Sequence, residues 1–528
     1  MGETGTLGES KIHNLTDSIN VNIRTFSEQV ASRFRSDATT IIIGFIVVCL
    51  ILVPYTSNGY WFDDALNSQV YYAIQRWQGD SFELLNFSFL VIKHWLLHEG
   101  RPMFAFLFGY TGFYFFHDLP TLRIAQCTSV LINIALFGYI LWLLGASLRF
   151  LTVWAIFLVG LFQIHGVGLD PVAGFAFHYQ ILGIQLAVVL IIFIKWVLHN
   201  NIRNLYLALA LWLLFMSCYE ANFIFIPIAF LVMVIHGNQY RKFPGVLLIL
   251  SAIIYLAVIY YLRTHAQGGA YEGSALGTPE KIWPAYLKQL TSSFPFISYL
   301  TVTHGTLPVD ALFKEAIGSA LAWAVFLLSL LIFAPPRPQP STTGNIRKEA
   351  FVISLGMFFL PAVFPAISMR YQNEVGWGIG TLPVYYQVFG LAFVLAWAMS
   401  FIPNRWPSRF TAAILISLYL ALNVTVNVSM VREIDIFWRL PRELLIDQGQ
   451  SGLFSHVQDG DIIHLKNVPH YVNANLIYES SGKRVFIPTE DHSWHPETPR
   501  NFASNFDLSR NAEGAYQITQ HPTPPGQP

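Results

Sequence analysis

Charged residues are scarce in this chain. Asp, Glu, Lys and Arg make up 12% of its 528 residues, whereas soluble domains contain about 25%. With 54% hydrophobic residues, the chain cannot cover its surface with polar groups, which excludes an ordinary soluble globular protein. Acidic and basic residues balance at 31 each, so no excess of positive charge points to nucleic acid or to another polyanionic partner.

Cysteine is also rare. Cys49, Cys127 and Cys218 all fall within apolar runs, where we expect them to pack as small apolar side chains rather than to form disulfides. They therefore indicate no redox compartment. The first apolar run starts near Thr39 and is followed by no small-residue cleavage site, so we interpret it as an anchor rather than a signal peptide.

What the chain does contain is a series of apolar runs between Thr39 and Met430. Many approach the length of about 20 residues that crosses a bilayer as a helix. We therefore predict an all-α polytopic membrane protein with about eleven transmembrane helices. The expected spans are Thr39–Tyr55, Leu122–Leu144, Phe150–Gln163, Ile181–Leu198, Leu205–Tyr219, Phe223–Ile235, Val246–Leu262, Ala311–Phe333, Phe351–Ile367, Tyr385–Ile402 and Phe410–Met430.

Basic residues in the short loops orient these spans, because cytoplasmic loops are enriched in Lys and Arg. Pro102–Phe116 is apolar but short for a crossing, so we interpret it as a juxtamembrane helix that returns to the same side. The turns then assigned to the cytoplasm contain Arg149, Arg203, Arg241, Lys242, Arg337, Arg347, Lys348, Arg405 and Arg409. This orientation predicts a multi-pass protein with a cytoplasmic N-terminus. We expect the membrane to be a bacterial inner membrane.

The same orientation places the segments Ser57–Thr121, His165–Gln180, Arg263–Asp310 and Ser368–Pro383 on the outer side. Three regions result: residues 1–38 form a cytoplasmic tail, residues 39–430 the membrane domain, and residues 431–528 a small extracytoplasmic α/β domain. The tail is either an interfacial amphipathic helix or loosely ordered. In the last region, Asp461–Leu465 and Lys483–Ile487 are typical of short strands, and a disordered Pro-rich tail ends the chain.

Two adjacent acids, Asp63 and Asp64, follow the first span directly. Beyond them, Gln69–Gln78 and Phe82–His98 have the apolar and aromatic character of juxtamembrane helices. A simpler role for Asp63 is to cap the following helix, but a cap requires only one such residue. The pair therefore predicts carboxylate chemistry at the outer membrane boundary.

This acid pair, together with the Leu122-Arg123 start of the next long span and the outer Asp170-Pro171, resembles the GT-C superfamily of membrane glycosyltransferases. The resemblance covers Thr39 to Met430. It implies a polyprenyl-phosphate sugar as donor, with a glycan, lipid or protein as acceptor. The chain lacks the His-Pro-Pro-Leu segment of protein mannosyltransferases and the Trp-Trp-Asp signature of oligosaccharyltransferases, which leaves the acceptor open.

Such a transfer needs a general base near the acceptor hydroxyl and cations near the departing phosphate. Asp63 and Asp64 are the candidate bases, and the sequence does not rank them. Candidate phosphate-binding residues are Arg101, Arg123 and Arg370. For Arg370, which follows a span on the outer side, snorkelling to the headgroup region is the alternative.

Two further outer acids are candidates for substrate binding. Asp170 could orient the acceptor or, with Asp64, bind a divalent cation such as Mg or Mn, although an Asp before a Pro is also ordinary turn chemistry. Glu220 lies at a tight outer turn between two spans, where ionisable residues are costly and often functional. The competing functions are a transporter or flippase of a lipid-linked saccharide and an O-antigen-type polymerase or ligase.

Overall fold

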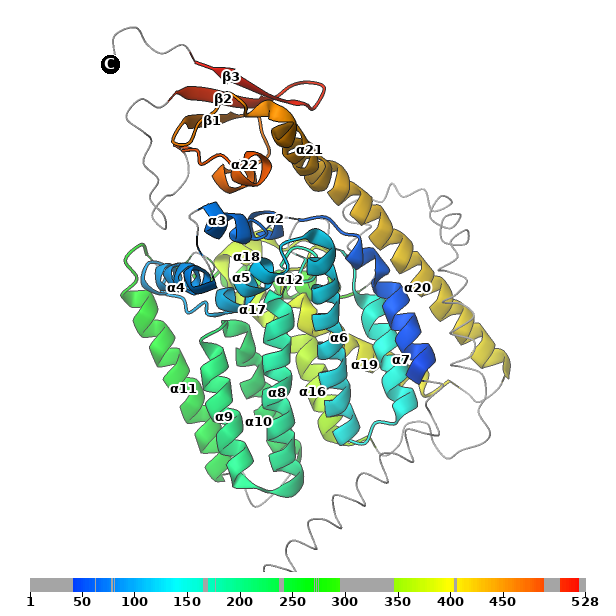
Figure 1. The fold of residues 1–528 in the computed structure, drawn as a ribbon. Helices are drawn as coiled ribbons and strands as arrows, with labels where there is room; N and C mark the ends of the chain where they lie inside the picture. The colour runs from blue at the N-terminus through cyan, green and yellow to red at the C-terminus, as the bar shows by residue number, and fades with distance from the viewer. Residues whose placement is uncertain are drawn as a thin grey trace, which may run out of the picture.

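The computed structural model describes residues 41–61, 63–76, 79, 81–164, 170–175, 177–236, 242–269, 271, 273, 275–294, 346–402, 406–488 and 504–521. Long apolar helices run side by side as a bundle, and short helices and a small sheet gather at one end of it (Figure 1). The predicted tail, residues 1–38, lies outside the described residues.

Five helical segments are long and apolar enough to cross a membrane. They are α6 (Leu119–Leu143), α8 (His178–His199), α11 (Lys242–Thr264), the run formed by α16 (Lys348–Phe359), η3 (Leu360–Ala362) and α17 (Val363–Ile367), and the segment that begins with α20 (Trp406–Ile434). The composition therefore predicted the class of protein correctly: these helices suit a membrane protein.

Shorter apolar helices occupy other expected spans. They are Ile41–Thr56, α7 (Leu148–Leu161), α9 (Ile202–Met216), η1 (Glu220–Ile224) with α10 (Phe225–His236), and α19 (Val384–Met399). The expected span Ala311–Phe333 lies outside the described residues. The number of crossings stays a prediction.

Local capping explains where several of these helices begin. The side chain of Asp118 accepts a hydrogen bond from Thr121 N at the start of α6, and Ser147 accepts from Phe150 N at the start of α7. Asn201 starts α9 in the same way, directly after Asn200 ends α8 in the left-handed conformation at φ 54°. Such side chains satisfy backbone N–H groups that the first turn of a helix leaves unpaired.

Buried asparagines join α20 to α7. The amides of Asn423 and Asn427 each donate to Phe162 O at 3.0 Å, and Asn427 accepts from Ile164 N at 2.9 Å. These bonds satisfy backbone groups at the C-terminal end of α7, which the apolar interior could not do.

Short helices form a layer at one end of the bundle, which we call the juxtamembrane layer after the boundary that the sequence predicts there. It contains α2 (Asp63–Asn67), α3 (Val70–Arg76), α4 (Ser81–Leu97), α5 (Ala105–Phe115), α12 (Pro279–Thr291) and α18 (Met369–Glu374). Helix α5 lies within the segment Pro102–Phe116. Its 11 residues span about 16 Å at 1.5 Å per residue, which is about half a hydrocarbon core.

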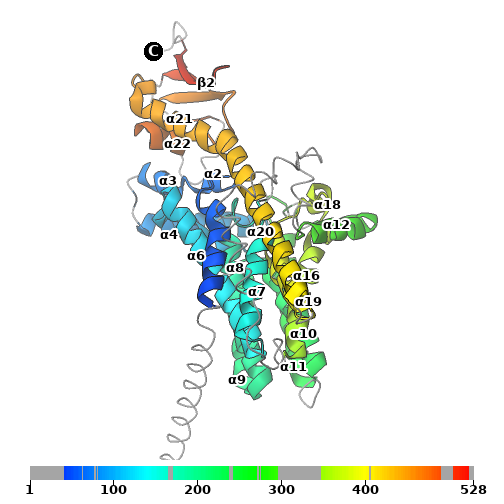
Figure 2. The ribbon, with the colours of Figure 1, turned by 90° about the vertical axis from the view of Figure 1, so that its right-hand side faces the viewer.

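The last long helix continues beyond Met430, the expected end of the final span. A π-helical turn at Asp435–Arg439 joins α20 to α21 (Leu440–Gln448), and a second such turn follows at Gly449–Leu453. Figure 2 shows this extension leaving the bundle and carrying the C-terminal region with it.

The C-terminal region contains a three-stranded sheet and α22 (Ala474–Ser481). Strand β1 (Ile462–Lys466) pairs in parallel with β2 (Asn505–Arg510), which pairs antiparallel with β3 (Tyr516–Gln520). The first expected strand is β1. The second, Lys483–Ile487, is not a full strand, but Phe486 bridges Ile462 in parallel. Phe486 O accepts from Ile463 N at 2.9 Å and Phe486 N donates to Asp461 O at 2.8 Å. The predicted disordered tail at residues 522–528 lies outside the described residues.

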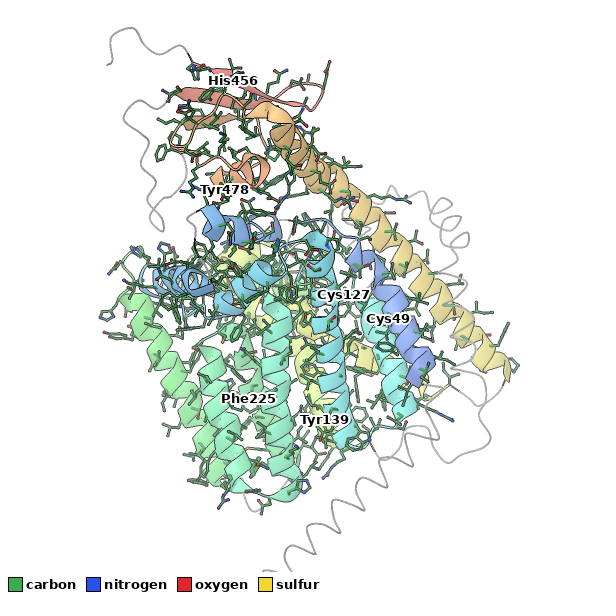
Figure 3. All side chains as sticks on the ribbon, in the orientation of Figure 1. Cys49, Cys127, Tyr139, Phe225, His456 and Tyr478 are labelled. Atoms are coloured by element: carbon green, nitrogen blue, oxygen red, sulfur yellow. The ribbon has the colours of Figure 1, made fainter. Side chains whose placement is uncertain are left out.

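One hydrophobic cluster joins the C-terminal region to the juxtamembrane layer. Val70 and Ile74 of α3 belong to the same cluster as Leu476 of α22 and Ile463 of β1. Tyr478, on the side of α22 that faces α3 (Figure 3), donates to Gln75 O at 3.4 Å. The C-terminal region is therefore seated on α2 and α3.

Candidate active-site cavity

A cavity of about 500 Å³ opens at the end of the bundle where the juxtamembrane helices lie. This size falls within the range of about 300–1,000 Å³ that is typical of small-molecule sites. Its walls come from α2, α5, the start of α8, the η1 turn, the end of α11, and α17 with α18. The charged residues of its lining are Asp63, Arg101, Glu220, Arg263, Arg370 and Glu374.

Four candidates from the sequence line this cavity together: Asp63, Arg101, Glu220 and Arg370. They come from segments up to about 300 residues apart in the chain, so the fold and not the sequence brings them together. The other three candidates, Asp64, Arg123 and Asp170, do not belong to its lining.

Asp63 is the first residue of α2 and is half-buried. Burial raises the pKa of its carboxyl to about 6, and the positive charge of Arg370 opposes this rise. A general base works best when its pKa is close to the working pH. Asp63 therefore has the accessibility and the proton affinity that a base in this cavity needs.

Asp64 has a different environment. Its side chain and that of Arg123 are both 0% exposed and form an ion pair at 3.0 Å. Arg123 also donates to Asn58 O at 3.0 Å, to Gln126 Oε1 at 2.6 Å and to Gly59 O. The Arg123 guanidinium thus holds the connection between the helix Ile41–Thr56 and α2. It does not line the cavity, so it is not placed for the phosphate contact that the sequence predicted.

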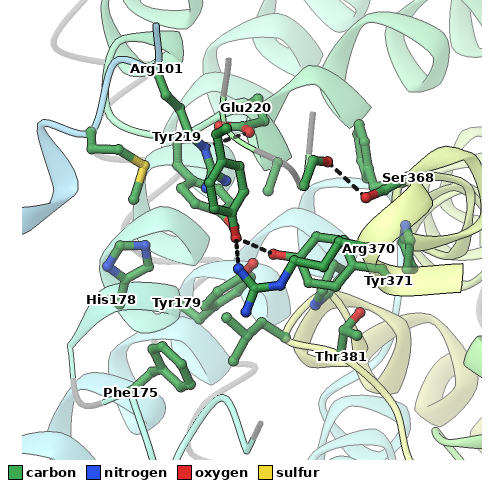
Figure 4. Close-up of a pocket in the computed structure, with 18 of the residues that line it drawn as sticks. Arg101, Phe175, His178, Tyr179, Tyr219, Glu220, Ser368, Arg370, Tyr371 and Thr381 are labelled. Carbon is green, nitrogen blue, oxygen red and sulfur yellow. Dashed lines mark hydrogen bonds and ion pairs between the residues drawn. The ribbon is translucent and has the colours of Figure 1, made fainter. Parts of the chain in front are cut away.

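Arg101 is held by three partners at the cavity wall. Its Nε lies 2.7 Å from Glu220 Oε1, and its guanidinium lies 4.7 Å from the ring centre of Tyr219 and 4.8 Å from that of Tyr271. Burial opposes the charged form, but Glu220 leads the neighbours that raise the pKa of Arg101 well above its usual value. Figure 4 shows this pair beside Tyr219.

Arg370 is more accessible, with 41% of its side chain exposed. Its Nε pairs with Glu374 at 2.7 Å, one helical turn further along, and another guanidinium nitrogen donates to Tyr271 Oη at 2.7 Å. Because Tyr271 also contacts Arg101, one tyrosine links the two guanidinium groups. An anion that enters the cavity can therefore meet Arg370.

Sequence reasoning did not single out Arg263, which lines the cavity at the end of α11. Its buried Nε has no hydrogen-bond partner in the described part of the chain. The sequence does contain a signal for Arg263. Like Arg370, it directly follows a predicted span on the outer side, where basic residues are rarer than on the cytoplasmic side.

Asp170 stabilises a turn, which was the alternative to a role in substrate or metal binding. It is 1% exposed, and its Oδ1 accepts hydrogen bonds from Val172 N at 2.8 Å and from Ala173 N. Together with the Asp64–Arg123 pair, this means that both carboxylates predicted for a divalent cation are bound by protein donors. These two carboxylates therefore fit a metal ion poorly, and a dependence on Mg or Mn stays a prediction.

No family model and no curated protein matches this chain.

On its other side, α2 contacts the C-terminal region through Arg442, which is 4% exposed. The Arg442 guanidinium donates to Ser68 Oγ at 2.6 Å and to Ala65 O at 3.4 Å, and it pairs with Glu479 at 2.8 Å. It also lies 4.4 Å from the ring centre of Tyr60. Arg442 thus fixes the helix that begins with Asp63.

Arg442→Ala is expected to loosen α2 and α3, because it leaves Glu479 without this partner and removes charged hydrogen bonds worth about 1.5–3 kcal/mol each. Hydrogen exchange of the α2 and α3 amides measures the effect. Arg439→Ala is the matched control, since Arg439 is 34% exposed and pairs with Asp435 and Glu443 at the surface, where such pairs contribute about 0–1 kcal/mol. Equal protection in the two variants would contradict the assignment.

Proposed function

We propose that this chain is a membrane glycosyltransferase that moves a sugar from a polyprenyl-phosphate donor to an acceptor on the extracytoplasmic face. The observation that carries the proposal is that Asp63, with a pKa near 6, lines the same cavity as the guanidinium groups of Arg101, Arg263 and Arg370. A base and a set of cations in one enclosed space are what a sugar transfer from a phosphate requires.

In the proposed reaction, an acceptor hydroxyl oxygen attacks the anomeric carbon of the donor while Asp63 takes the hydroxyl proton. The bond between the anomeric carbon and the phosphate oxygen breaks, and its electron pair stays on the phosphate. Arg370 and Arg263 stabilise the charge that develops there. Arg101, which Glu220 already neutralises, forms part of the cavity wall.

The position of basic residues supports an outer location for the cavity. Arg149, Arg203, Lys242 and Arg347 lie near the starts of α7, α9, α11 and α16, at the end of the bundle opposite the juxtamembrane layer (Figure 1). Basic ends of membrane helices face the cytoplasm. A Thr278→Cys variant should therefore react with an impermeant maleimide from outside intact cells and Arg203→Cys should not; the reverse result rules out this orientation.

A transfer assay tests the function. Purified full-length protein in lipid nanodiscs is incubated with polyprenyl-phosphate sugars that carry a radiolabelled hexose or pentose, together with glycan, glycolipid and peptide acceptors. We expect labelled product and free polyprenyl phosphate in equal amounts from at least one pair. If vesicle-reconstituted protein moves a lipid-linked saccharide across the bilayer and breaks no bond, the transporter alternative replaces this proposal.

The pH dependence of transfer provides a further prediction. Asp63 must be deprotonated to act as base, so kcat/KM is expected to rise as pH increases through about 6 and to level off above it. Arg370 lowers the pKa of Asp63, so its removal in Arg370→Gln should shift the midpoint to higher pH. A midpoint that shifts to lower pH, or a profile that is flat from pH 5 to 8, contradicts the role of Asp63.

A further inference from the structure

One wall of the cavity is a single face of α5. Phe106, Gly109, Tyr110 and Phe113 all line the cavity, and their spacing places them on the same side of a helix. Asp63 and Asn67, one turn apart on α2, line it as well. The cavity therefore combines an aromatic wall with a carboxylate and an amide.

The centre of this wall is open. Gly109 is buried, yet a methyl group placed on it would meet no atom within 4 Å. At Gly112, three residues further along α5, the same methyl group would collide with the ring of Phe177. Alanine is more favourable than glycine within a helix, and alanine would fit at position 109. Neither helix stability nor packing within the fold therefore explains the glycine at this position.

The residues around this opening fit a sugar ring. Phe106 and Tyr110 are stacked, with ring centres 5.3 Å apart, and aromatic faces attract the polarised C–H groups on the flat side of a pyranose. The carboxylate of Asp63 and the amide of Asn67 supply hydrogen-bond acceptors and donors for its hydroxyl groups. A lipid chain would leave these polar groups unpaired, and a peptide would bring backbone groups that aromatic rings do not satisfy.

Asp63 lies next to this wall. Burial raises the pKa of Tyr110, and the charge of Asp63 raises it further, which indicates that the two side chains are close. The guanidinium groups of Arg101 and Arg370 gather instead around Tyr271. The charge of Arg370 also acts on Asp63 and lowers its pKa, so Asp63 lies within reach of both sides of the cavity. A hydroxyl bound at the α5 wall can then be deprotonated by Asp63 while the phosphate is bound by Arg370 on the side of Tyr271.

We propose that the α5 wall at Gly109 is the acceptor subsite and that the acceptor is a glycan or glycolipid whose pyranose ring lies against Phe106 and Tyr110. This inference rests on the proposed function and names the acceptor class that the sequence left open.

The test uses purified full-length protein with Gly109→Ala, Gly109→Leu and the matched variant Phe108→Leu, whose side chain is 42% exposed on the same helix. Binding of methyl hexopyranosides is measured by saturation-transfer NMR. We expect at least one pyranoside to bind wild type and Phe108→Leu equally, and Gly109→Leu at least tenfold more weakly. The melting temperature of Gly109→Ala should equal or exceed that of wild type. Filling the position would then not destabilise the fold, and the weaker binding of Gly109→Leu could not be explained by unfolding.

Kinetics separate the acceptor from the donor. In Gly109→Leu, the KM for the acceptor should rise at least tenfold and by more than the KM for the donor, whereas Phe108→Leu should leave both KM values within twofold of wild type. A rise in donor KM instead, or no binding of any pyranoside by wild type, overturns the subsite. If pyranosides bind in a Gly109-dependent manner but no donor is ever cleaved, the subsite stands and the proposed transferase function fails.

Discussion

Asp63→Asn is expected to lower the rate of sugar transfer by about 10²–10⁴-fold, the usual contribution of a general base. The substitution keeps the shape of the side chain but removes its ability to take a proton. Because Asp63 is half-buried at the cavity and belongs to none of the described ion pairs, the fold should survive. The measurement is kcat at saturating donor and acceptor, with the melting temperature as a check on folding.

Glu374→Gln is the control for this effect. Glu374 also lines the cavity, but its carboxylate is bound to Arg370. Loss of the Glu374 charge should therefore alter the KM for the donor by less than about tenfold, or 1.4 kcal/mol. Asp63→Glu should recover part of the activity because it restores a carboxylate. If Asp63→Asn transfers sugar as fast as wild type, the base has been assigned to the wrong residue.

Asp64→Ala is expected to destabilise the protein by about 3–5 kcal/mol, since it leaves the Arg123 charge buried without its carboxylate. Both side chains are fully buried, so water cannot replace the lost partner. Folding is measured by thermal unfolding of the detergent-solubilised protein and by the yield of monodisperse material. Asp63→Ala, at the neighbouring position of the same helix, should give nearly wild-type yield.

The double variant Asp64→Ala with Arg123→Met distinguishes a loss of charge balance from a loss of packing. Replacing both members of a buried ion pair by apolar groups is often neutral or stabilising, so the double variant should be more stable than Asp64→Ala alone. A double variant that is less stable than Asp64→Ala would show that Arg123 stabilises the fold mainly through its bonds to Asn58 O and Gly59 O.

The sequence determined the helical, membrane-type architecture, because apolar runs of sufficient length cannot be exposed to water. It also determined that Pro102–Phe116 contains a short helix and that the acid pair directly follows the first apolar run. It predicted β1, where isoleucines follow one another. Strands β2 and β3 were missed because polar residues such as Asn505, Ser509 and Gln517 interrupt them, and only pairing with neighbouring strands stabilises them.

Only the tertiary structure decided which acid faces the cavity. Successive residues of a helix point about 100° apart, so Asp63 and Asp64 cannot share one environment, but the sequence does not reveal which side of α2 meets Arg123. That Arg263 and Arg370 line the same cavity was equally hidden, since it depends on how α11 and α18 are arranged around that cavity. The hydrophobic runs along the chain determine which segments form the helices. The packing between these helices determines which of the few charged residues become neighbours.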